Sequence, residues 1–356
     1  MEKKTVTKQE IRKIITALPK TEIHLHLEGL VSVDTLWKLK AKHNLSLSGI
    51  KTKADLYNRF KVKSLNEFID LFINVIQSSF QAEEDILFLI EDARDYLKRN
   101  NIVYAEIFFA PSKFVRNGFS FPKMLEILDA GAKSLKKEEN LEIKYLIDVS
   151  RTFGPENAMH NLNQTLNNRK DSIIGIGLGG SEDKGPAQDY KKVFKKARKH
   201  DLHVVAHAGE DIGPDSIWHA IKDLKTERIG HGISAVQDDS LMNYLTKSKI
   251  PLEICPKSNI FTGRYVSSYK NHPIRTFFDQ GVNVTLNTDD PTIFGVELID
   301  EYMNLLTEEI FTFNELITIL KNTLFASFLD DKRKKEIWNT ISNSLSKIGD
   351  KPSTIA

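Results

Sequence analysis

The chain has 356 residues, a length that suits one barrel domain with additional helices or two domains of average size. Lys and Arg number 50 and Asp and Glu number 48, so the formal net charge is only +2. This balance argues against a surface specialised for nucleic acid or for an anionic membrane, because both require a marked excess of positive charge. The charge therefore predicts a small neutral substrate and no nucleic-acid partner.

The cysteine content and the distribution of apolar residues bear on the location of the protein. Cys255 is the only cysteine, which excludes an intramolecular disulfide and favours a reducing compartment. The segment Met1–Leu18 mixes charged and apolar side chains and lacks the continuous apolar core of a signal peptide. No segment approaches the roughly 18 to 20 apolar residues that a membrane helix needs. We expect a cytoplasmic protein with no membrane partner.

Short β-rich segments alternate with longer segments of helical periodicity, and no low-complexity linker divides the chain. Such alternation predicts parallel strands joined by crossover helices. The pattern predicts a (β/α)8 barrel, or TIM barrel, in one domain that spans residues 1–356. The expected strands are Glu22–Leu27, Ile102–Phe109, Glu142–Val149, Ile173–Leu178, Leu202–His207, Glu227–Gly230, Ile250–Ile254 and Val282–Asn287.

Two helical regions exceed what a minimal barrel needs: an insertion at Thr35–Arg99, after the first strand, and Glu308–Ala356, after the last. Loops that follow the strands build the active-site face of such barrels, so the insertion is expected either to act as a lid or to form a packed helical layer. The lysine-rich run Lys191–Lys199 places its apolar residues on one helical face, which predicts a solvated crossover helix and not an anion site.

Four side chains at predicted strand ends form a candidate metal site. His24 and His26 lie two residues apart in the first strand, so both imidazoles project from the same face. His207 and Asp289 lie at the ends of the fifth and eighth strands, and a barrel brings all its strand ends to one rim. Three imidazoles and one carboxylate suit Zn²⁺ and leave a position for water, as catalysis requires. The sequence predicts one catalytic zinc ion per subunit.

Other candidate ligands are less favoured. A binuclear site on this fold needs a bridging carboxylate or a modified lysine near the end of the fourth strand, where the sequence reads Gly177-Leu178-Gly179-Gly180. His203 lies at the start of the fifth strand, away from the rim, so we expect a structural role for it. Cys255 is expected to be a small buried side chain.

Five segments, in order and at family-like spacing, resemble the adenosine deaminase family, and the resemblance extends from Leu18 to about Leu329. Each segment alone is weak evidence, whereas the five together form a specific signal. The segments are Leu18–Gly29, His207–Glu210, Arg228–Gly232, Glu253–Asn259 and Leu286–Pro291.

The resemblance implies that zinc is held by the four ligands named above, with Asp289 counted among the catalytic residues. It implies that Glu210 protonates purine N1 while hydroxide attacks C6, and that His231 orients the attacking water. It further implies that Asp290 bonds purine N7 and that the Gly180 N–H bonds N3. Elementary chemistry agrees with the role of Glu210, because attack at C6 builds up negative charge that a proton at N1 stabilises.

Two departures from the family pattern concern the ribose side of the substrate. Glu28 stands where these enzymes usually have an aspartate that receives the 5′-hydroxyl, and Gly177–Glu182 lacks two of the usual acidic residues. Both departures resemble relatives that deaminate 6-aminodeoxyfutalosine, an adenine nucleoside with a bulky aromatic 5′ substituent. Arg151, after the third strand, is either a partner for a carboxylate on such a substrate or a surface loop residue.

The leading hypothesis is zinc-dependent deamination of a purine nucleoside, adenosine or 2′-deoxyadenosine, with 6-aminodeoxyfutalosine as the alternative. Free adenine is less favoured, because the Thr262-Gly263 segment resembles nucleoside enzymes more than adenine deaminases. A binuclear hydrolase of the same fold would bind two metal ions. A non-catalytic binding protein would have lost ligands or gained a signal peptide, and the sequence shows neither. The sequence leaves the oligomeric state open.

Overall fold

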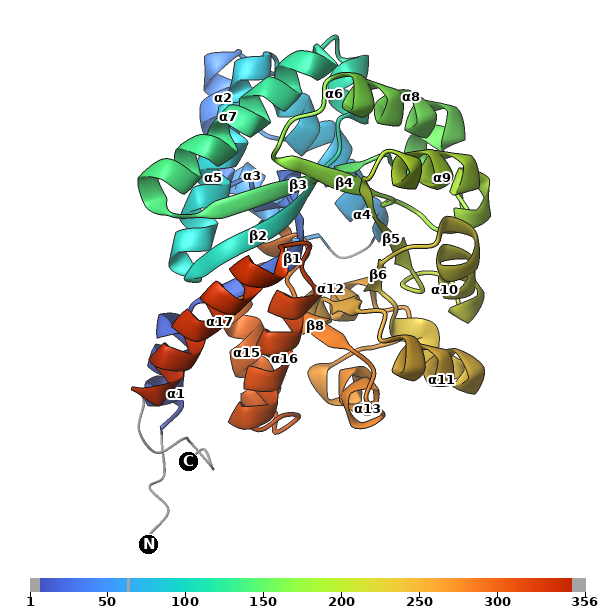
Figure 1. The fold of residues 1–356 in the computed structure, drawn as a ribbon. Coiled ribbons are helices and arrows are strands. Elements are labelled where there is room, and N and C mark those ends of the chain that lie inside the picture. Colours follow the sequence, from blue (N-terminus) through green and yellow to red (C-terminus); the bar gives the residue numbers. More distant parts are fainter. Residues whose placement is uncertain (1–6, 63–64, 348–356) are drawn as a thin grey trace, which may run out of the picture.

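The computed structural model describes residues 7–62 and 65–347, which form a barrel of parallel strands surrounded by helices (Figure 1). The eight strands pair in chain order, and each pair of neighbours is parallel. The predicted (β/α)8 class is confirmed, with strand bounds that differ from the expected ones by a few residues. The strands are β1 (Lys20–His26), β2 (Ile102–Phe109), β3 (Glu142–Asp148), β4 (Ile173–Gly177), β5 (His203–Ala208), β6 (Arg228–His231), β7 (Leu252–Ile254) and β8 (Val284–Leu286).

The first and last strands meet through a short seam at their carboxyl ends. The His26 N–H donates to the Asp289 carbonyl at 3.0 Å, and the Asp289 N–H donates to the His24 carbonyl at 3.2 Å. Leu25 and Asp289 face each other as an isolated parallel bridge. Three of the four predicted metal ligands therefore belong to the backbone junction that joins β8 to β1.

The helical insertion after β1 is shorter than predicted. Helix α5 (Ile86–Arg99) packs against α7 (Phe121–Glu139) and β2, so it is the crossover helix from β1 to β2 and not part of the insertion. The expected span Thr35–Arg99 thus combined two features. The insertion itself consists of α2 (Val33–Lys42), α3 (Lys53–Arg59), α4 (Leu65–Asp70) and a π-helical stretch at Leu71–Gln77.

The region after β8 is helical, as predicted, in the part that the structure describes. Helix α16 (Phe313–Ala326) packs against β8 and β1, where it covers the seam from outside, and α17 (Asp331–Ser346) packs on α16. The expected helical region extended to residue 356, and its last nine residues lie outside the described part. The other helices are α1 (Lys8–Ala17), α6 (Ser112–Arg116), α8 (Gly154–Asn167), α9 (Lys191–Lys199), α10 (Pro214–His219), α11 (Asp239–Ser248), α12 (Pro256–Thr262), α13 (Ile274–Asp279), α14 (Pro291–Phe294) and α15 (Leu298–Thr307).

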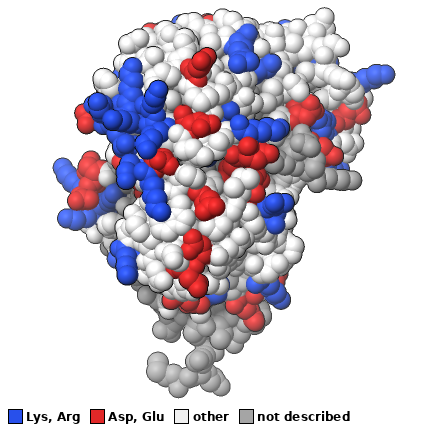
Figure 2. Space-filling view, turned by 90° about the vertical axis from the view of Figure 1, so that its right-hand side faces the viewer, with Lys and Arg blue, Asp and Glu red and all other residues white. Residues whose placement is uncertain are grey.

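The lysine-rich helix α9 is a crossover helix with one buried face, as its sequence predicts. Val193, Phe194 and Ala197 are buried, and Lys191 is exposed and pairs with Asp223 at 3.0 Å. In Figure 2, Lys and Arg gather in a patch at the left of the view, with Asp and Glu at the margins of this patch and across the centre of the face. Within the described residues, no helix is long and apolar enough to cross a membrane.

Strand β1 is buried at every position although most of its side chains are polar. Buried polar groups require hydrogen-bond partners, and Lys20 at the start of the strand finds its partners among backbone carbonyls. The Lys20 ammonium donates to the carbonyls of Leu18 at 2.7 Å and Asn100 at 2.9 Å, with no carboxylate among its hydrogen-bond partners. Burial lowers the pKa of Lys20 to about 7.

The substitution Lys20→Met should change the pH dependence of stability in a defined direction. The pKa of Lys20 is about 7 in the folded protein and about 10.4 in an unfolded chain, so between these values the unfolded state binds one more proton. The unfolding free energy of the wild type should therefore rise with pH relative to that of the variant, by at most about 1.4 kcal/mol per pH unit. Denaturant melts of both proteins from about pH 7 to pH 10 measure the difference. A difference that does not vary with pH would contradict the expectation.

Candidate active site

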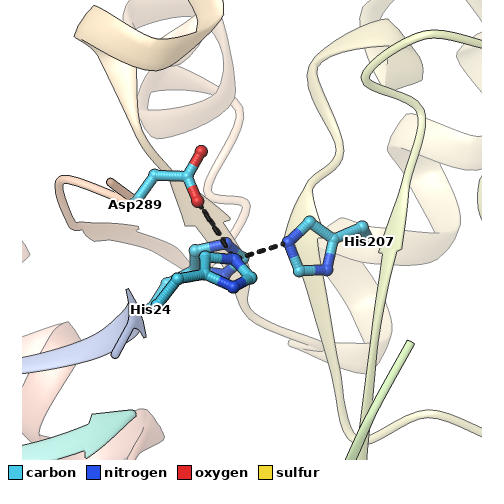
Figure 3. A group of neighbouring side chains, drawn as sticks. His24, His207 and Asp289 are labelled. Carbon is cyan, nitrogen blue, oxygen red and sulfur yellow. Dashed lines mark hydrogen bonds and ion pairs between the residues drawn. The ribbon is translucent and has the colours of Figure 1, made fainter. Parts of the chain in front are cut away.

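The four predicted metal ligands converge at the carboxyl ends of β1, β5 and β8. Asp289 Oδ1 lies 3.4 Å from His24 Nε2 and 3.2 Å from His26 Nε2. His26 Nε2 lies 3.2 Å from His207 Nε2, and one ligand atom from each of the four residues lies within 4.8 Å of the other three. Figure 3 shows His207 reaching from the opposite wall toward the His24 imidazole and the Asp289 carboxylate. The structure thus brings together residues that the sequence separates by up to 265 positions.

These separations fit side chains that share one metal ion. Ligand atoms about 2.0–2.1 Å from a common ion lie about 2.8–3.4 Å apart when the angles between the bonds are about 90–110°. The His24 Nε2 atom is buried and has no hydrogen-bond partner among the described residues. The His26 and His207 Nε2 atoms face each other, and a neutral pair of this kind shares at most one hydrogen. A cation satisfies all these lone pairs together, so the donor set fits a divalent ion.

The backbone is strained where the strands end at this cluster. His231 closes β6 with φ +61° and Asp289 follows β8 with φ +69°, both in the left-handed region that residues other than glycine rarely adopt. Nearby glycines allow close approach of the site residues. A Cβ atom on Gly29 would lie 2.0 Å from Asp290 Oδ1, and one on Gly230 would lie 2.9 Å from His24 Cε1. The packing of the site therefore requires glycine at positions 29 and 230.

A row of buried charges lies behind His24. Glu253 on β7 accepts from His24 Nδ1 at 2.6 Å and from Arg228 Nε at 2.5 Å, and Arg228 also pairs with Glu106 on β2 at 2.6 Å. Burial alone would raise the pKa of Glu253, but Arg228 and His24 outweigh it and lower the pKa. An ionised carboxylate at Nδ1 fixes the tautomer that leaves the Nε2 lone pair of His24 free for a metal ion.

Glu253 and Arg228 belong to segments that resemble the family, but the sequence analysis predicted no role for either residue. Both are charged residues inside buried strands, as is Glu106, and a charge within a buried strand must be paired. That pattern could have identified the row. Asp148 at the end of β3 was also missed. Its carboxylate accepts the Ser150 N–H at 2.7 Å, and the side chain lines the cavity described below.

Glu210, the predicted acid, lies beside the cluster. Its Oε2 atom is 3.3 Å from His231 Nε2. The turn that carries it is held by Glu182, whose carboxylate accepts three successive backbone N–H groups, those of residues 209–211, at 2.8–3.0 Å. Burial and the neighbouring Asp289 raise the pKa of Glu210 well above its ordinary value. The environment therefore favours a protonated acid at this position.

Helix α12 contributes two polar contacts to the site. Ser258 Oγ donates to Asp289 Oδ2 at 2.7 Å, and the Asn259 amide lies 3.1 Å from His231 Nδ1. The segment that resembles the family thus supports both a metal ligand and the residue predicted to orient water. Neither Ser258 nor Asn259 was assigned a function from the sequence, because their partners come from other strands.

A cavity opens directly above the cluster, and both the barrel rim and the insertion line it. The rim contributes His26, His207, Glu210, His231, Asp289, Asp290 and Gly180, and the insertion contributes Phe68, Ile69, Phe72, Ile73 and Gln77. Phe68 stacks on Phe294 with ring centroids 5.6 Å apart, and Phe294 lies 5.0 Å from Phe261. The insertion therefore builds an aromatic wall of the cavity. Its movement as a lid stays a prediction.

The predicted substrate-binding residues divide into two groups. Asp290 and Gly180 line the cavity, and the buried Asp290 Oδ1 has no hydrogen-bond partner within the described residues. Glu28 lies behind the cavity wall, where its Oε1 accepts from Gln77 Nε2 and from the Ala110 N–H, both at 3.1 Å. Burial raises the pKa of Glu28 to about 7. Gln77 and Ala110 thus stand between Glu28 and the cavity.

Arg151 lies in a different position from either alternative considered for it. Its side chain is buried, with 2% of the residue exposed, and it does not line the cavity. Nη2 donates to the His207 carbonyl at 2.5 Å, and Nη1 donates to the Gly185 carbonyl. In this arrangement Arg151 supports the end of β5 that carries His207 rather than contacting a substrate.

His203 and Cys255 occupy the positions expected for structural residues. His203 begins β5 and pairs with Glu227 at 2.8 Å on the partly exposed side of the barrel away from the rim. Cys255 is buried, although its sulfur lies within 4.8 Å of ring nitrogens of His24 and His231. Burial raises the pKa of the Cys255 thiol well above its ordinary value, and a protonated thiol is a poor metal ligand.

The fold and the donor set together are those of a (β/α)8 barrel whose rim carries a site that fits a metal ion. Residues 19–344 match the model of one protein family, described as adenosine deaminase. The chain belongs to the adenosine deaminase family, which confirms the resemblance seen in its five segments. It is therefore an aminohydrolase, an enzyme that removes an amino group by hydrolysis.

Curated relatives carry three different activities in their names. An aminodeoxyfutalosine deaminase of Streptomyces avermitilis is 33% identical over 335 residues, which cover 93% of this chain and 92% of the relative. An adenine deaminase of Psychrobacter cryohalolentis is 30% identical and covers 93% and 99%. An adenosine deaminase of Clostridium acetobutylicum is 33% identical and covers 91% and 97%. The reaction class is common to all three, and the substrate differs.

Solved structures agree with the fold. The crystal structure of an adenine deaminase from Arthrobacter aurescens has a TM-score of 0.86 and 26% identity, and the match covers 93% of this chain and all of that one. An amidohydrolase from Burkholderia ambifaria, solved with bound zinc, has the same TM-score at 21% identity and covers 95% and 93%.

The substitution Glu253→Gln should weaken metal binding about 10–100-fold, because a neutral amide no longer fixes the His24 tautomer and leaves Arg228 without one of its counter-charges. Competition between the folded protein and a chromophoric chelator for Zn²⁺ measures the affinity. The control is Glu227→Gln, which also removes a carboxylate 2.8 Å from a histidine but does so at the surface. Equal affinities for wild type and Glu253→Gln would show that the buried carboxylate has no influence on the ligand.

Proposed function

We propose that the protein is a zinc-dependent deaminase that hydrolyses the 6-amino group of an adenine nucleoside, adenosine or 2′-deoxyadenosine, and releases ammonia. One observation carries the proposal. Glu210 and His231 lie 3.3 Å apart at the floor of a cavity, directly beside the four converging ligands. A proton donor, a polar group for the attacking water and a metal site are thus available to a single reacting carbon.

His24, His26, His207 and Asp289 would hold the ion, and a bound Zn²⁺ lowers the pKa of a coordinated water and so supplies a nucleophile near neutral pH. His231 lies 4.0 Å from Asp289 Oδ2 and has no hydrogen-bond partner at Nε2, so this nitrogen is available to orient the attacking oxygen. The Ser258 hydroxyl, bonded to the same Asp289 oxygen, keeps the carboxylate from rotating. These contacts determine the face of the purine ring that is attacked.

Glu210 moves the proton that the reaction needs at the ring. Burial and the neighbouring Asp289 raise the pKa of its carboxyl and so favour the protonated form, which donates to purine N1 as oxygen adds to C6. The electron pair of the C6–N1 double bond then rests on a protonated nitrogen. The C6–O bond forms, and the attacking water gives up its two protons, one to restore the Glu210 carboxyl and one to the amino group. The C6–N6 bond then breaks and ammonia leaves. The product carries a carbonyl at C6.

Asp290 and Gly180 would position the purine. Purine N7 has a lone pair and no hydrogen, so Asp290 must donate to it as a protonated carboxyl. Burial and the neighbouring Asp289 favour this form, because they raise the pKa of Asp290 well above its ordinary value. The unpartnered Asp290 Oδ1 is suited to this bond, and the Gly180 N–H to a bond with N3. Gly180 has φ +94°, a conformation that glycine alone adopts without strain, and a Cβ there would lie 3.0 Å from Thr152 Oγ1. A small residue is therefore needed where the backbone approaches the substrate.

The second candidate substrate is 6-aminodeoxyfutalosine, and the aromatic wall favours it. Phe68, Phe72, Phe261 and Phe294 present apolar surface beside the polar floor. A bulky aromatic 5′ substituent could pack on this surface, whereas a ribose 5′-hydroxyl leaves it uncovered. The relative from Streptomyces avermitilis is named for this substrate. Glu28, which stands in place of the usual aspartate, lies behind Gln77 and does not line the cavity.

The residues present do not favour a binuclear hydrolase. Among the described residues, the two groups of side chains that could hold an ion share His24, so they do not form two separate sites. The end of β4, where a bridging ligand would be needed, carries only Gly177, Leu178, Gly179 and Gly180.

The substitution Glu210→Gln should lower kcat about 10²–10⁴-fold, because the amide cannot transfer a proton to N1. KM and the affinity for Zn²⁺ should change little, since Glu210 is not a ligand. Release of ammonia from the best nucleoside substrate gives kcat, and Glu91→Gln, an exposed residue on α5, serves as the control. Turnover close to that of the wild type would remove Glu210 from the mechanism.

A substrate panel distinguishes the possible 5′ groups. We expect the zinc-loaded protein to deaminate adenosine or 2′-deoxyadenosine with a higher kcat/KM than free adenine, which makes fewer contacts with the cavity wall. If 6-aminodeoxyfutalosine exceeds both nucleosides about tenfold or more, the second candidate replaces the first. Loss of that advantage in Phe68→Ala, with adenosine turnover retained, would place the 5′ group on the aromatic wall. A protein that deaminates none of the four compounds would refute the proposed function.

A further inference from the structure

A chain of three hydrogen bonds lies behind His231, on the side away from the cavity. Asn259 Nδ2 is 3.1 Å from His231 Nδ1, and Asn259 Oδ1 is 3.2 Å from His272 Nε2. The Ile274 backbone N–H donates to His272 Nδ1 at 3.0 Å. The three side chains are nearly fully buried, with 0–3% of each residue exposed. Solvent therefore does not compete for these bonds.

The direction of every bond in this chain follows from its far end. A backbone N–H is always a donor, so His272 Nδ1 must accept and its proton must lie on Nε2. His272 Nε2–H then donates to Asn259, which must present its carbonyl oxygen to His272 and its amide N–H to His231. Burial lowers the pKa of His272 to about 3, so the ring is neutral and has a single proton.

We propose that Asn259 and His272 act as positioning residues which fix His231 in the tautomer that bears its proton on Nε2. His231 is thereby a hydrogen-bond donor toward the reacting oxygen and not a base that accepts a proton from it. This inference deepens the proposed function and rests on it. The His231 Nε2 atom is buried and makes no hydrogen bond, although Glu210 Oε2 lies 3.3 Å away, which matches a donor held ready for the reacting oxygen.

The same site provides the opposite arrangement for comparison. Behind His24, the acceptor is the carboxylate of Glu253, which takes the proton at Nδ1 and leaves a lone pair on Nε2. Behind His231, the group at Nδ1 is the Asn259 amide donor, which leaves Nε2 protonated. The two imidazoles lie close together, with ring centroids 5.0 Å apart, yet only His24 can bind a cation through Nε2. The hydrogen-bond chain therefore also excludes His231 from the metal ligands.

The substitution Asn259→Asp replaces the hydrogen-bond donor at His231 Nδ1 with an acceptor and changes the shape of the side chain little. A carboxylate still accepts the His272 Nε2–H, but it can only accept at His231 Nδ1, so a neutral His231 must move its proton from Nε2 to Nδ1. If His231 is a donor, kcat should fall about 10²–10³-fold with a smaller change in KM. If His231 acts as a base, the carboxylate should maintain or increase kcat, as it does in catalytic triads, and the inference would be overturned.

The matched control is Asn161→Asp on α8. Asn161 is also buried and donates to Ser112 Oγ at 2.8 Å, and neither residue lines the cavity, so this variant reports the general effect of a buried carboxylate. A second pair of variants tests the hydrogen bond between His272 and Asn259. His272→Gln offers an N–H to Asn259 and should retain more activity than His272→Leu, which offers none. Equal activities of these two variants, with equal melting temperatures, would contradict a role for His272 in the chain.

The tautomers can also be measured directly, without reference to activity. In protein labelled with ¹⁵N-histidine, long-range ¹H–¹⁵N correlations distinguish protonated from unprotonated ring nitrogens, and His231→Gln assigns the signals. We expect protonated Nε2 in His231 and His272, protonated Nδ1 in His24, and transfer of the His231 proton to Nδ1 in Asn259→Asp. The kcat of this variant is measured at a pH at which the spectra show a neutral His231 ring.

A wild-type His231 protonated at Nδ1 would overturn the inference and leave the deaminase proposal standing. Absence of deamination with this tautomer present would refute the function alone.

Discussion

The geometry of the site depends on the closure of the barrel between β8 and β1. Two backbone hydrogen bonds make this closure, and they involve the residues whose side chains are the expected ligands, His24, His26 and Asp289. The junction requires Asp289 to adopt φ +69°, a conformation that costs of order 1–3 kcal/mol and persists only where surrounding structure enforces it. The parallel ladder of the barrel and the cover provided by α16 supply that enforcement. The ligand set is therefore assembled by folding and does not depend on flexible loops.

Once the imidazoles converge, the groups behind them determine what each one does. His24 and His231 share burial, rim position and neighbourhood, and they differ in the partner at Nδ1: a carboxylate for one and an amide donor for the other. Arg228 keeps Glu253 ionised in a place where burial alone would raise its pKa. The interior thus combines a paired charge row and a neutral hydrogen-bond chain a few ångströms apart. Each stabilises one tautomer, and the difference between them separates metal binding from donation.

The sequence predicted the parts of this arrangement that follow from local periodicity. Alternation along β1 placed His24 and His26 on one face, and strand ends placed His207 and Asp289 at the same rim. It could not predict contacts that depend on which strands become neighbours. Glu253 and Arg228 form a pair because β6 and β7 are adjacent, and Glu253 reaches His24 because β8 alone separates β7 from β1. The family resemblance placed Glu28 near the substrate, whereas Arg151 was expected either beside the substrate or in a surface loop. Their side chains instead turn toward backbone carbonyls and toward Gln77, which no local pattern encodes.

Catalytic groups on the barrel and a cavity wall from the insertion also explain why relatives equally similar to this chain carry three different substrate names. The groups that would hold the ion, transfer the proton and orient the oxygen lie at strand ends and on α12, where the barrel ladder and buried hydrogen bonds fix them. The wall that a 5′ substituent would meet comes from Phe68 and Phe72 in the insertion, which is excess to the barrel. Substitutions in that wall alter the shape of the cavity without disturbing the seam or the tautomers. Identity averaged over some 335 aligned residues is dominated by the scaffold and is therefore insensitive to the few side chains that select the substrate.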